Sequence, residues 1–326
     1  MTKLNNSGFL VISLDFELLW GIFDKVDWRN KKEYFENTKE VIPQILQLFQ
    51  EYGIHATWAT VGMLFNRGWN QWKSNYPKVI PYYKNEKLNP YEYGTSIVSP
   101  STEEFCFAPD LIKQINSTHG QELATHTYSH YYCKEEGQKL KMFKSDLQVA
   151  VKLSKTFGIE LKSLVFPRNQ FNEEYVKICE ELGIENIRTN PSNWYWNNPE
   201  QDTLSQKIFR SGDAYFGFHD KSYNLKDLKA NSNAVIHQKA SRMLRPFSSN
   251  RMLEFFKLRR IKEEISHSAK HKKIYHLWWH PHNFGEFPKE SLNQLETILK
   301  HYQYCNKKYD FESLTMAELG NRAKYL

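Results

Sequence analysis

Short apolar runs alternate with amphipathic segments along most of this chain, and no other feature of the sequence constrains the fold as strongly. The run at residues 8–14, GFLVISL, is rich in β-branched side chains and is typical of a buried strand. Residues 37–52 then place apolar side chains at helical spacing, and Gly53 follows as a stop signal. The run at 54–62 predicts a second strand. This order, repeated, indicates parallel strands joined by helices.

The same order returns further along the chain. We predict further strands at 121–126, 163–166, 184–188 and 274–280. We predict helices at about 109–116, 145–157, 172–183 and 289–304, the last of them closing the chain, and one or two long basic helices within 233–272. Because no linker or internal repeat is visible, residues 1–326 are expected to form one α/β domain.

Two aromatic-rich segments, near 63–108 and 189–232, interrupt this order and are predicted to be insertions between core elements. The first contains Trp69 and Trp72, and the second contains Trp194 and Trp196.

The bulk composition excludes few classes of protein. Lys and Arg number 44 against 37 Asp and Glu, so the formal charge is +7, which is too diffuse to indicate a nucleic-acid partner. The four cysteines show no C-x-x-C pairing, which favours free thiols in a reducing compartment. No signal peptide and no run of about 20 apolar residues is present, so a cytoplasmic location without a transmembrane segment is expected.

Polar side chains that could bind a metal or transfer a proton follow four of the predicted strands. Parallel strands present their carboxyl ends at one edge, so these side chains are expected to meet there. The pairs are Asp15 and Glu17, His126 and His130, Arg168 and Asn169, and His280 and His282. Two imidazoles four residues apart share a face on a helix or tight turn and can form half of a divalent-metal site.

Five segments carry a resemblance to a known family: SLDFE (13–17), ATWATVG (56–62), GQELATHTYSH (120–130), VFPRNQ (165–170) and LWWHPHN (277–283). With them the chain resembles the polysaccharide deacetylase superfamily, the homologues of chitooligosaccharide deacetylase. The resemblance covers most of the chain outside the two insertions. It implies a distorted (β/α) barrel of about seven parallel strands. It also implies a metal-dependent hydrolase that removes an N-acetyl group from an amino sugar or from a polysaccharide or glycoconjugate precursor, as in cell-surface polysaccharide biosynthesis.

The resemblance also implies roles for individual residues. His126 and His130 match the family's metal ligands, and Asp15 matches its catalytic base. The family's metal carboxylate commonly follows the base directly. Phe16 stands at that position here, so Glu17 is expected to be the third ligand. Strand alternation places Asp15 and Glu17 on one side, which leaves the reverse assignment open. Zinc is the expected cofactor, although two histidines and a carboxylate suit other divalent metals.

The remaining expectations concern the proton donor and the substrate. His280 matches the family's general acid, with His282 as its competitor, and Arg168 matches the arginine that orients the base. Trp20, Asn169, His282 and Trp194 are expected to contact substrate. The insertion tryptophans, Trp69, Trp72, Trp194 and Trp196, either line a sugar cleft or form local core.

Three questions of function stay open on the sequence alone. The first is the partner: whether the sugar is free or linked to a nucleotide or a lipid. The basic residues of 251–273 bear on it, because they either form a solvated helix face or contact an anionic partner, including a membrane surface. Hydrolysis of another non-peptide C–N bond is the alternative reaction. A catalytically inactive carbohydrate-binding protein is the alternative class.

Overall fold

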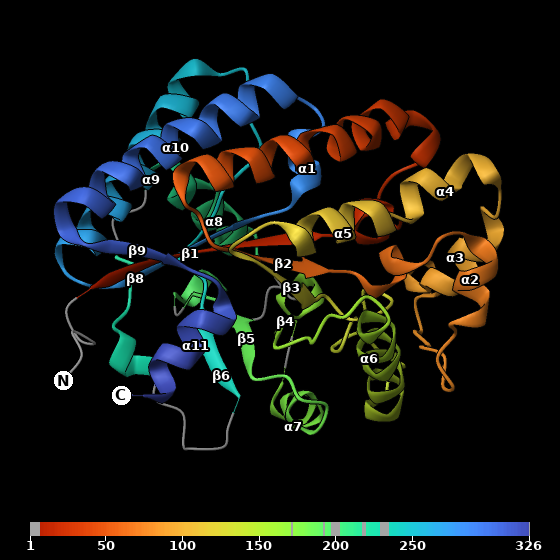
Figure 1. Cartoon of the computed structure of the whole chain (residues 1–326). Helices are drawn as coiled ribbons and strands as arrows, with labels where there is room; N and C mark the ends of the chain where they lie inside the picture. Colours follow the sequence, from red (N-terminus) through yellow and green to blue (C-terminus); the bar gives the residue numbers. More distant parts are fainter. Residues whose placement is uncertain are drawn as a thin grey trace.

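The structure is a computed structural model that describes residues 7–170, 172–191, 193–196, 203–216, 220–228 and 235–325. Within these residues a nine-stranded sheet forms the centre of the molecule, in the order β6-β5-β4-β3-β2-β1-β8-β7, with β9 also paired to β1 (Figure 1). Every pairing between these strands is parallel. The strands are β1 (Gly8–Phe16), β2 (Ala56–Thr60), β3 (Gln121–Thr125), β4 (Ser163–Val165), β5 (Asn186–Thr189), β6 (Ile236–Lys239), β7 (Arg242–Met243), β8 (Ile274–Trp279) and β9 (Phe311–Leu314).

The two ends of the strand order meet, which curls the sheet into a distorted barrel. Only Ala240 and Ser241 separate β6 from β7. The amide of Ala240 donates to the Thr189 carbonyl of β5 at 2.8 Å, and the amide of Ser241 donates to the His276 carbonyl of β8 at 2.8 Å. Consecutive residues therefore bridge both sides of the opening. The predicted distorted (β/α) barrel is confirmed.

Helices cover the outside of this barrel (Figure 1). On one side α1 packs against α5 and α10, and α10 packs against α9. The helices are α1 (Lys32–Tyr52), α2 (Trp69–Ser74), α3 (Pro90–Ser96), α4 (Pro100–Cys106), α5 (Pro109–Ser117), α6 (Leu140–Lys155), α7 (Glu173–Glu181), α8 (Leu204–Phe216), α9 (Arg251–Lys270), α10 (Pro288–Tyr309) and α11 (Met316–Lys324). Short 3₁₀ turns are η1 (Leu18–Gly21), η2 (Trp28–Lys31), η3 (Gly62–Phe65), η4 (Glu86–Leu88), η5 (Pro167–Asn169), η6 (Trp194–Trp196), η8 (Leu225–Leu228) and η9 (Pro281–Phe284).

Three expectations about elements were wrong. The segment predicted as basic helices holds β6 and β7 before its single long helix α9, and the helix predicted to close the chain is followed by β9 and α11. The first helix begins at Lys32 and not at residue 37, and the Asn37 side chain inside it donates to the Gly285 carbonyl at 2.9 Å. In β6 and β7 the buried polar residues Gln238 and Arg242 break the apolar pattern that marks a strand.

The first predicted insertion contains η3, α2, η4, α3 and α4, and its buried aromatic rings extend the main hydrophobic core of the barrel. Trp20 stacks on Trp72 with ring centroids 6.0 Å apart, and Trp69 and Tyr91 also pack against Trp72. All four rings are buried. The second predicted insertion contains η6, α8 and η8, with residues 192, 197–202, 217–219 and 229–232 outside the described residues.

The described part of the chain contains no helix long and apolar enough to cross a bilayer. All four cysteines are buried free thiols, as their spacing predicted.

Candidate metal centre

The carboxyl end of β1 carries both acids of the site. Asp15 is the next-to-last residue of the strand, and Glu17 directly follows its final residue, Phe16. Phe16, between them, packs edge-on against Trp58 with ring centroids 6.4 Å apart. Asp15 and Glu17 are both buried. The strand thus delivers two carboxylates into the interior with an apolar side chain between them.

A tight turn after β3 presents the two histidines. Thr127 and His130 adopt positive φ angles of 63° and 56°, so residues 126–130 form a turn and not a helix. Buried Asp146 of α6 holds this turn, because its carboxylate accepts from the amide of Tyr128 at 2.8 Å and from the amide and hydroxyl of Ser129. Burial raises the pKa of Asp146 to about 6, and these donors act in the opposite direction.

Glycine is required where η3 meets this turn. The amide of Gly62 donates to the Thr127 carbonyl at 2.8 Å, and a Cβ at position 62 would lie 2.8 Å from the Cα of Tyr128. The sequence ATWATVG therefore supports the histidine turn through backbone approach.

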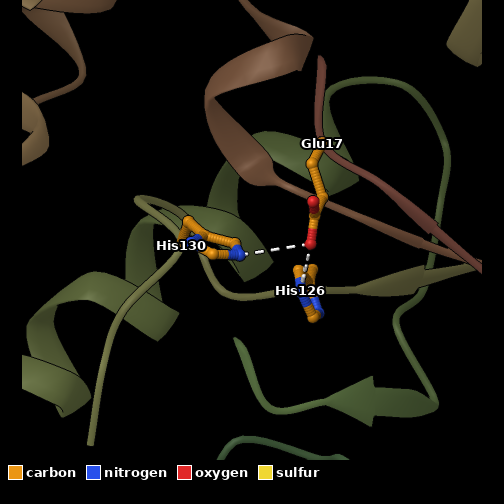
Figure 2. Close-up of side chains that lie close together, drawn as sticks. All are labelled: Glu17, His126 and His130. Atoms are coloured by element: carbon orange, nitrogen blue, oxygen red, sulfur yellow. Dashed lines mark hydrogen bonds and ion pairs between the residues drawn. The ribbon is translucent and has the colours of Figure 1, made fainter. Parts of the chain in front are cut away.

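The two histidines converge on Glu17 (Figure 2). The Nε2 atom of His126 lies 3.0 Å from Glu17 Oε1, and the Nε2 atom of His130 lies 3.2 Å from the same oxygen. These three side chains come from β1 and from the turn after β3, and each is buried. Their ligand atoms lie close enough together to hold one metal ion.

The hydrogen bonds behind the histidines suit a cation. His126 Nδ1 lies 2.8 Å from the Val165 carbonyl, which can only accept, so Nδ1 carries a proton and Nε2 is the nitrogen that faces Glu17. That buried Nε2 has no hydrogen-bond partner among the described residues. His130 Nδ1 contacts the Tyr132 hydroxyl at 3.0 Å. A carboxylate facing the Nε2 atoms of two histidines is the donor set of a divalent metal, so the residues present fit the expected cofactor.

The electrostatics of Glu17 agree with this arrangement. Burial alone would raise the pKa of Glu17, but its histidine neighbours, His280 and His130 first and then His126, outweigh burial and hold that pKa well below its usual range. Glu17 is therefore a buried carboxylate in its charged form, as a metal ligand must be.

Asp15 has a different partner. Both of its oxygens accept from the Arg188 guanidinium, at 2.7 Å and 2.6 Å, and both side chains are buried. Arg188 also donates to Ser13 Oγ at 3.0 Å and to Asn169 Oδ1 at 3.2 Å, and its guanidinium lies 4.3 Å from the centre of the Trp278 ring. A bidentate pair of this kind fixes the orientation of the carboxylate.

The arginine expected beside Asp15 was Arg168, and the structure places it elsewhere. Arg168 donates to Asp24 at 2.5 Å and lies over the Tyr132 ring at 4.3 Å. Arg188 was missed because it belongs to β5, which was predicted only as a strand. An arginine inside a short apolar strand was the available signal, since such a charge is rarely buried without a partner.

His280 and His282 lie beside the two acids. His280 Nε2 is 3.8 Å from both Asp15 Oδ2 and Glu17 Oε1, and its ring stacks on that of His282 with centroids 4.9 Å apart. His282 Nδ1 is 3.8 Å from Glu17 Oε2. About a quarter of the His280 side chain is exposed (23%), whereas His282 is buried, and burial together with His280 lowers the pKa of His282 to about 3.

Of the residues expected to contact substrate, some are buried and others are exposed. Trp20 is fully buried and its indole donates to the Cys106 carbonyl at 2.7 Å, so it offers no face to a ligand. Trp69 and Trp72 are buried in the same aromatic core. Asn169 contacts Arg188, as described above. Trp194 is half exposed and packs edge-on against Phe209, and Trp196 lies beneath the Arg210 guanidinium.

The chain matches one family model, Polysaccharide deacetylase, over residues 22–187, just over half of its length. The chain belongs to the polysaccharide deacetylase family. The matched residues include His126, His130 and Arg168, whereas Asp15 and Glu17 precede them. None of the curated proteins matches this chain in sequence.

Solved structures resemble this polysaccharide deacetylase family member in fold. A Mycobacterium smegmatis protein named as a polysaccharide deacetylase aligns with a TM-score of 0.61 and 12% identity, over 100% of this chain and 93% of that one. A Pseudomonas aeruginosa PAO1 protein named as a polysaccharide deacetylase aligns with a TM-score of 0.52 and 9% identity, over 97% and 89%. An allantoinase aligns with a TM-score of 0.52 and 10% identity, over 97% and 88%.

Proposed function

We propose that this polysaccharide deacetylase family member is a metal-dependent hydrolase that removes the N-acetyl group from an amino sugar, free or carried on a polysaccharide or glycoconjugate precursor. The observation that carries the proposal is one buried cluster. Glu17, His126 and His130 face one another there, and Asp15 and His280 lie beside them. A binding protein would have no need of two acids and an adjoining histidine at such a point.

Glu17, His126 and His130 would hold the cation. When bound, a divalent ion such as zinc would lower the pKa of water from about 16 to about 7 and polarise the amide carbonyl. Because Glu17 carries one negative charge and the two imidazoles are neutral, the occupied site would keep a net positive charge toward the carbonyl oxygen. Three protein ligands leave open positions for water and substrate.

Asp15 is the base in this proposal. Arg188 occupies one lone-pair direction on each carboxylate oxygen, and each oxygen keeps another. Oδ2, which faces His280, can therefore accept the proton of the attacking water. The opposite assignment, with Asp15 as the ligand, is less well supported because neither His126 nor His130 contacts Asp15 in the described contacts.

His280 is the acid. It lies within reach of both carboxylates and keeps part of its ring exposed, so it can deliver a proton to the departing nitrogen while contacting solvent. His282 is buried behind it, and its stacking on His280 orients the acid. The amine then leaves neutral and acetate is the second product.

The test measures acetate release from a panel of N-acetyl sugars, free and nucleotide- or lipid-linked, with zinc, manganese, cobalt or nickel restored to metal-free protein. Asp15→Asn should lower kcat by at least about 100-fold while bound metal stays near one ion per chain, since removal of a general base costs about 10²–10⁴-fold. Glu17→Gln should lose both metal and activity. Asp110→Asn, an exposed acid of α5, is the matched control and should retain both.

Three outcomes would count against the proposal. Bound metal without acetate release from any member of the panel, but with hydrolysis of other amides, would favour the alternative C–N substrate. Absence of both metal and turnover would favour a carbohydrate-binding protein. Loss of metal in Asp15→Asn but not in Glu17→Gln would exchange the two acids.

A further inference from the structure

Large exposed apolar side chains gather on the segments that leave the carboxyl ends of β5, β7 and β8. Leu204 and Ile208 of α8 are 75% and 60% exposed, and Met252 and Phe255 of α9 are 69% and 60% exposed. The apolar rim is defined here as Trp194, Leu204, Ile208, Phe209, Met252, Phe255 and Phe287. Single exposed apolar residues are ordinary, but a gathering of this kind marks an interaction surface.

Ring pairs and helix packing join the segments that carry the apolar rim. Trp194 packs on Phe209 with ring centroids 5.2 Å apart. Phe287 packs on half-buried Phe247 at 5.5 Å. Between these pairs, the Arg245 guanidinium donates to the Arg210 carbonyl of α8 at 3.2 Å, and α8 packs against α9. The two groups of rings thus belong to adjoining segments.

The apolar rim lies at the edge of the barrel where the candidate metal centre lies. All strands are parallel, so the segments that follow β5, β7 and β8 emerge at the same edge as Asp15 and Glu17. Arg188, which holds Asp15, is in β5, six residues before η6 begins. His280 directly follows β8, and Phe287 lies seven residues further on. An object bound to the apolar rim would therefore lie beside the mouth of the site.

Arginines adjoin the apolar rim. Among the described residues no carboxylate pairs with Arg245 or with exposed Arg251, and burial together with Arg245 lowers the pKa of Arg210. Arginines that repel one another next to exposed rings complement an anionic surface. Trp, Phe, Leu and Met flanked by Arg is also the composition of segments that lie at a bilayer interface.

We propose that the apolar rim and its arginines dock the protein on an anionic phospholipid bilayer, with the mouth of the candidate metal centre toward the lipid. Arg245 and Arg251 contact phosphate headgroups, and Ile208, Phe209, Met252 and Phe255 enter the headgroup boundary. The attachment is peripheral and reversible. It goes beyond the proposed reaction and does not depend on it, because it concerns association and not turnover.

The experiment sediments the full chain, without substrate, with vesicles of phosphatidylcholine alone or mixed with phosphatidylglycerol at low and high salt. We expect binding to the mixed vesicles that weakens as salt rises. Arg251→Glu and Phe255→Ser should each weaken that binding by at least about fivefold. Both sites are exposed, so circular dichroism should show that the variants fold.

Each variant has a matched control at the opposite edge of the barrel. Lys270→Glu reverses a charge at the other end of α9, and Tyr304→Ser removes a ring of α10 that is 51% exposed. Both should bind as the unchanged protein does. The proposal is overturned if the unchanged protein does not bind anionic vesicles, or if the controls lose as much binding as the rim variants. It is also overturned if the rim instead forms a dimer that Phe255→Ser dissociates. Acetate release is measured in parallel on the same protein. A protein that releases acetate but does not bind vesicles contradicts only the docking proposal, and one that binds vesicles without releasing acetate contradicts only the proposed reaction.

Discussion

At the scale of single residues, the main feature is that two acids only two positions apart have different partners. Glu17 faces two imidazole nitrogens, whereas each oxygen of Asp15 accepts one hydrogen bond from the same guanidinium, that of Arg188. A buried carboxylate needs a positive charge beside it, which a bound cation would supply to Glu17 and which Arg188 supplies to Asp15. The partners, and not the acids themselves, divide the roles.

The first prediction concerns the arginine that holds Asp15. Arg188→Lys keeps a positive charge but removes the fork that contacts both oxygens, so Asp15 should lose its fixed orientation. We expect kcat to fall by about 10- to 100-fold with KM and bound metal nearly unchanged, since misplacement of a catalytic group costs about that much. Steady-state kinetics and metal analysis measure the three quantities.

Arg168→Lys is the control for this prediction, because Arg168 was the residue that the family resemblance indicated. It contacts Asp24 and Tyr132 and should leave kcat within a few-fold of the unchanged protein. A larger loss of kcat in Arg168→Lys than in Arg188→Lys would contradict the assignment drawn from these contacts.

The sequence was informative about the site wherever side chains follow directly from a strand. Glu17, His126, His130 and His280 could be placed together because parallel strands end at one edge. Arg188 could not, since its role depends on which neighbour it reaches across the barrel, and spacing along the chain does not encode that distance. Trp20 was wrongly expected at the substrate. It is buried by rings of the 63–108 segment, and such contacts between residues remote in sequence cannot be read from the local pattern.

At the scale of elements, the C-terminal helix α11 illustrates how one hydrogen-bonded junction fastens an element to the barrel. Thr315 and Glu318 form a capping box at its start. The Glu318 carboxylate also contacts His55 Nδ1 at 2.8 Å, next to β2. The hydrogen bond that Glu318 accepts from His55 raises the pKa of His55. Burial raises that of Glu318, but His55 and Thr315 outweigh burial and lower it.

The second prediction follows from this junction. The pKa of His55 is raised in the fold, so its stabilising effect is complete below its ordinary value of 6.5 and is lost as pH rises through the raised value. The pKa of Glu318 is lowered, so its effect is present above 4.5 and is lost as pH falls through the lowered value. The junction should therefore stabilise most between these ordinary values, by about 0.5–1 kcal/mol for a partly exposed pair.

Melting curves of the unchanged protein and His55→Gln test this prediction between pH 4 and pH 9. The difference in Tm should be about 1–3 °C near pH 5.5 and should shrink toward pH 9. His271→Gln, at the exposed end of α9, should show no such pH dependence. A difference that grows with rising pH would have the wrong sign for an ion pair.

Element prediction succeeded where the apolar pattern was continuous and failed where polar residues entered the barrel. Strands β1, β2 and β8 carry unbroken buried runs near the predicted positions, and β3 is buried over its last three residues. β6 and β7 are four and two residues long and bury Gln238 and Arg242. Their strand pairing is held by neighbours remote in sequence, so local periodicity carries little signal for them.

At the scale of the whole molecule, the candidate metal centre joins segments that are far apart in the chain. Glu17 follows β1, His126 and His130 follow β3, and His280 follows β8, next to β1 in the sheet. A cation held by all three ligands would bind only the folded arrangement, because Glu17 lies more than 100 residues from His126 and His130 in the sequence. Metal binding should therefore raise the free energy of unfolding of the entire fold.

The last prediction is a thermal one. Zinc at about 100 times its dissociation constant should stabilise the protein by about 2.7 kcal/mol, which corresponds to a rise in Tm of about 5 °C. One sheet includes every strand of the described residues, so residues 1–326, if they form one domain as predicted, should melt in a single transition that moves as a whole. Glu17→Gln should abolish the shift. His271→Gln, which breaks the pair of His267 and His271 at the end of α9, should keep the shift and so exclude zinc binding at that pair as its cause. Two separate transitions, only one of them responsive to zinc, would contradict the single domain, and an undiminished shift in Glu17→Gln would place the metal elsewhere.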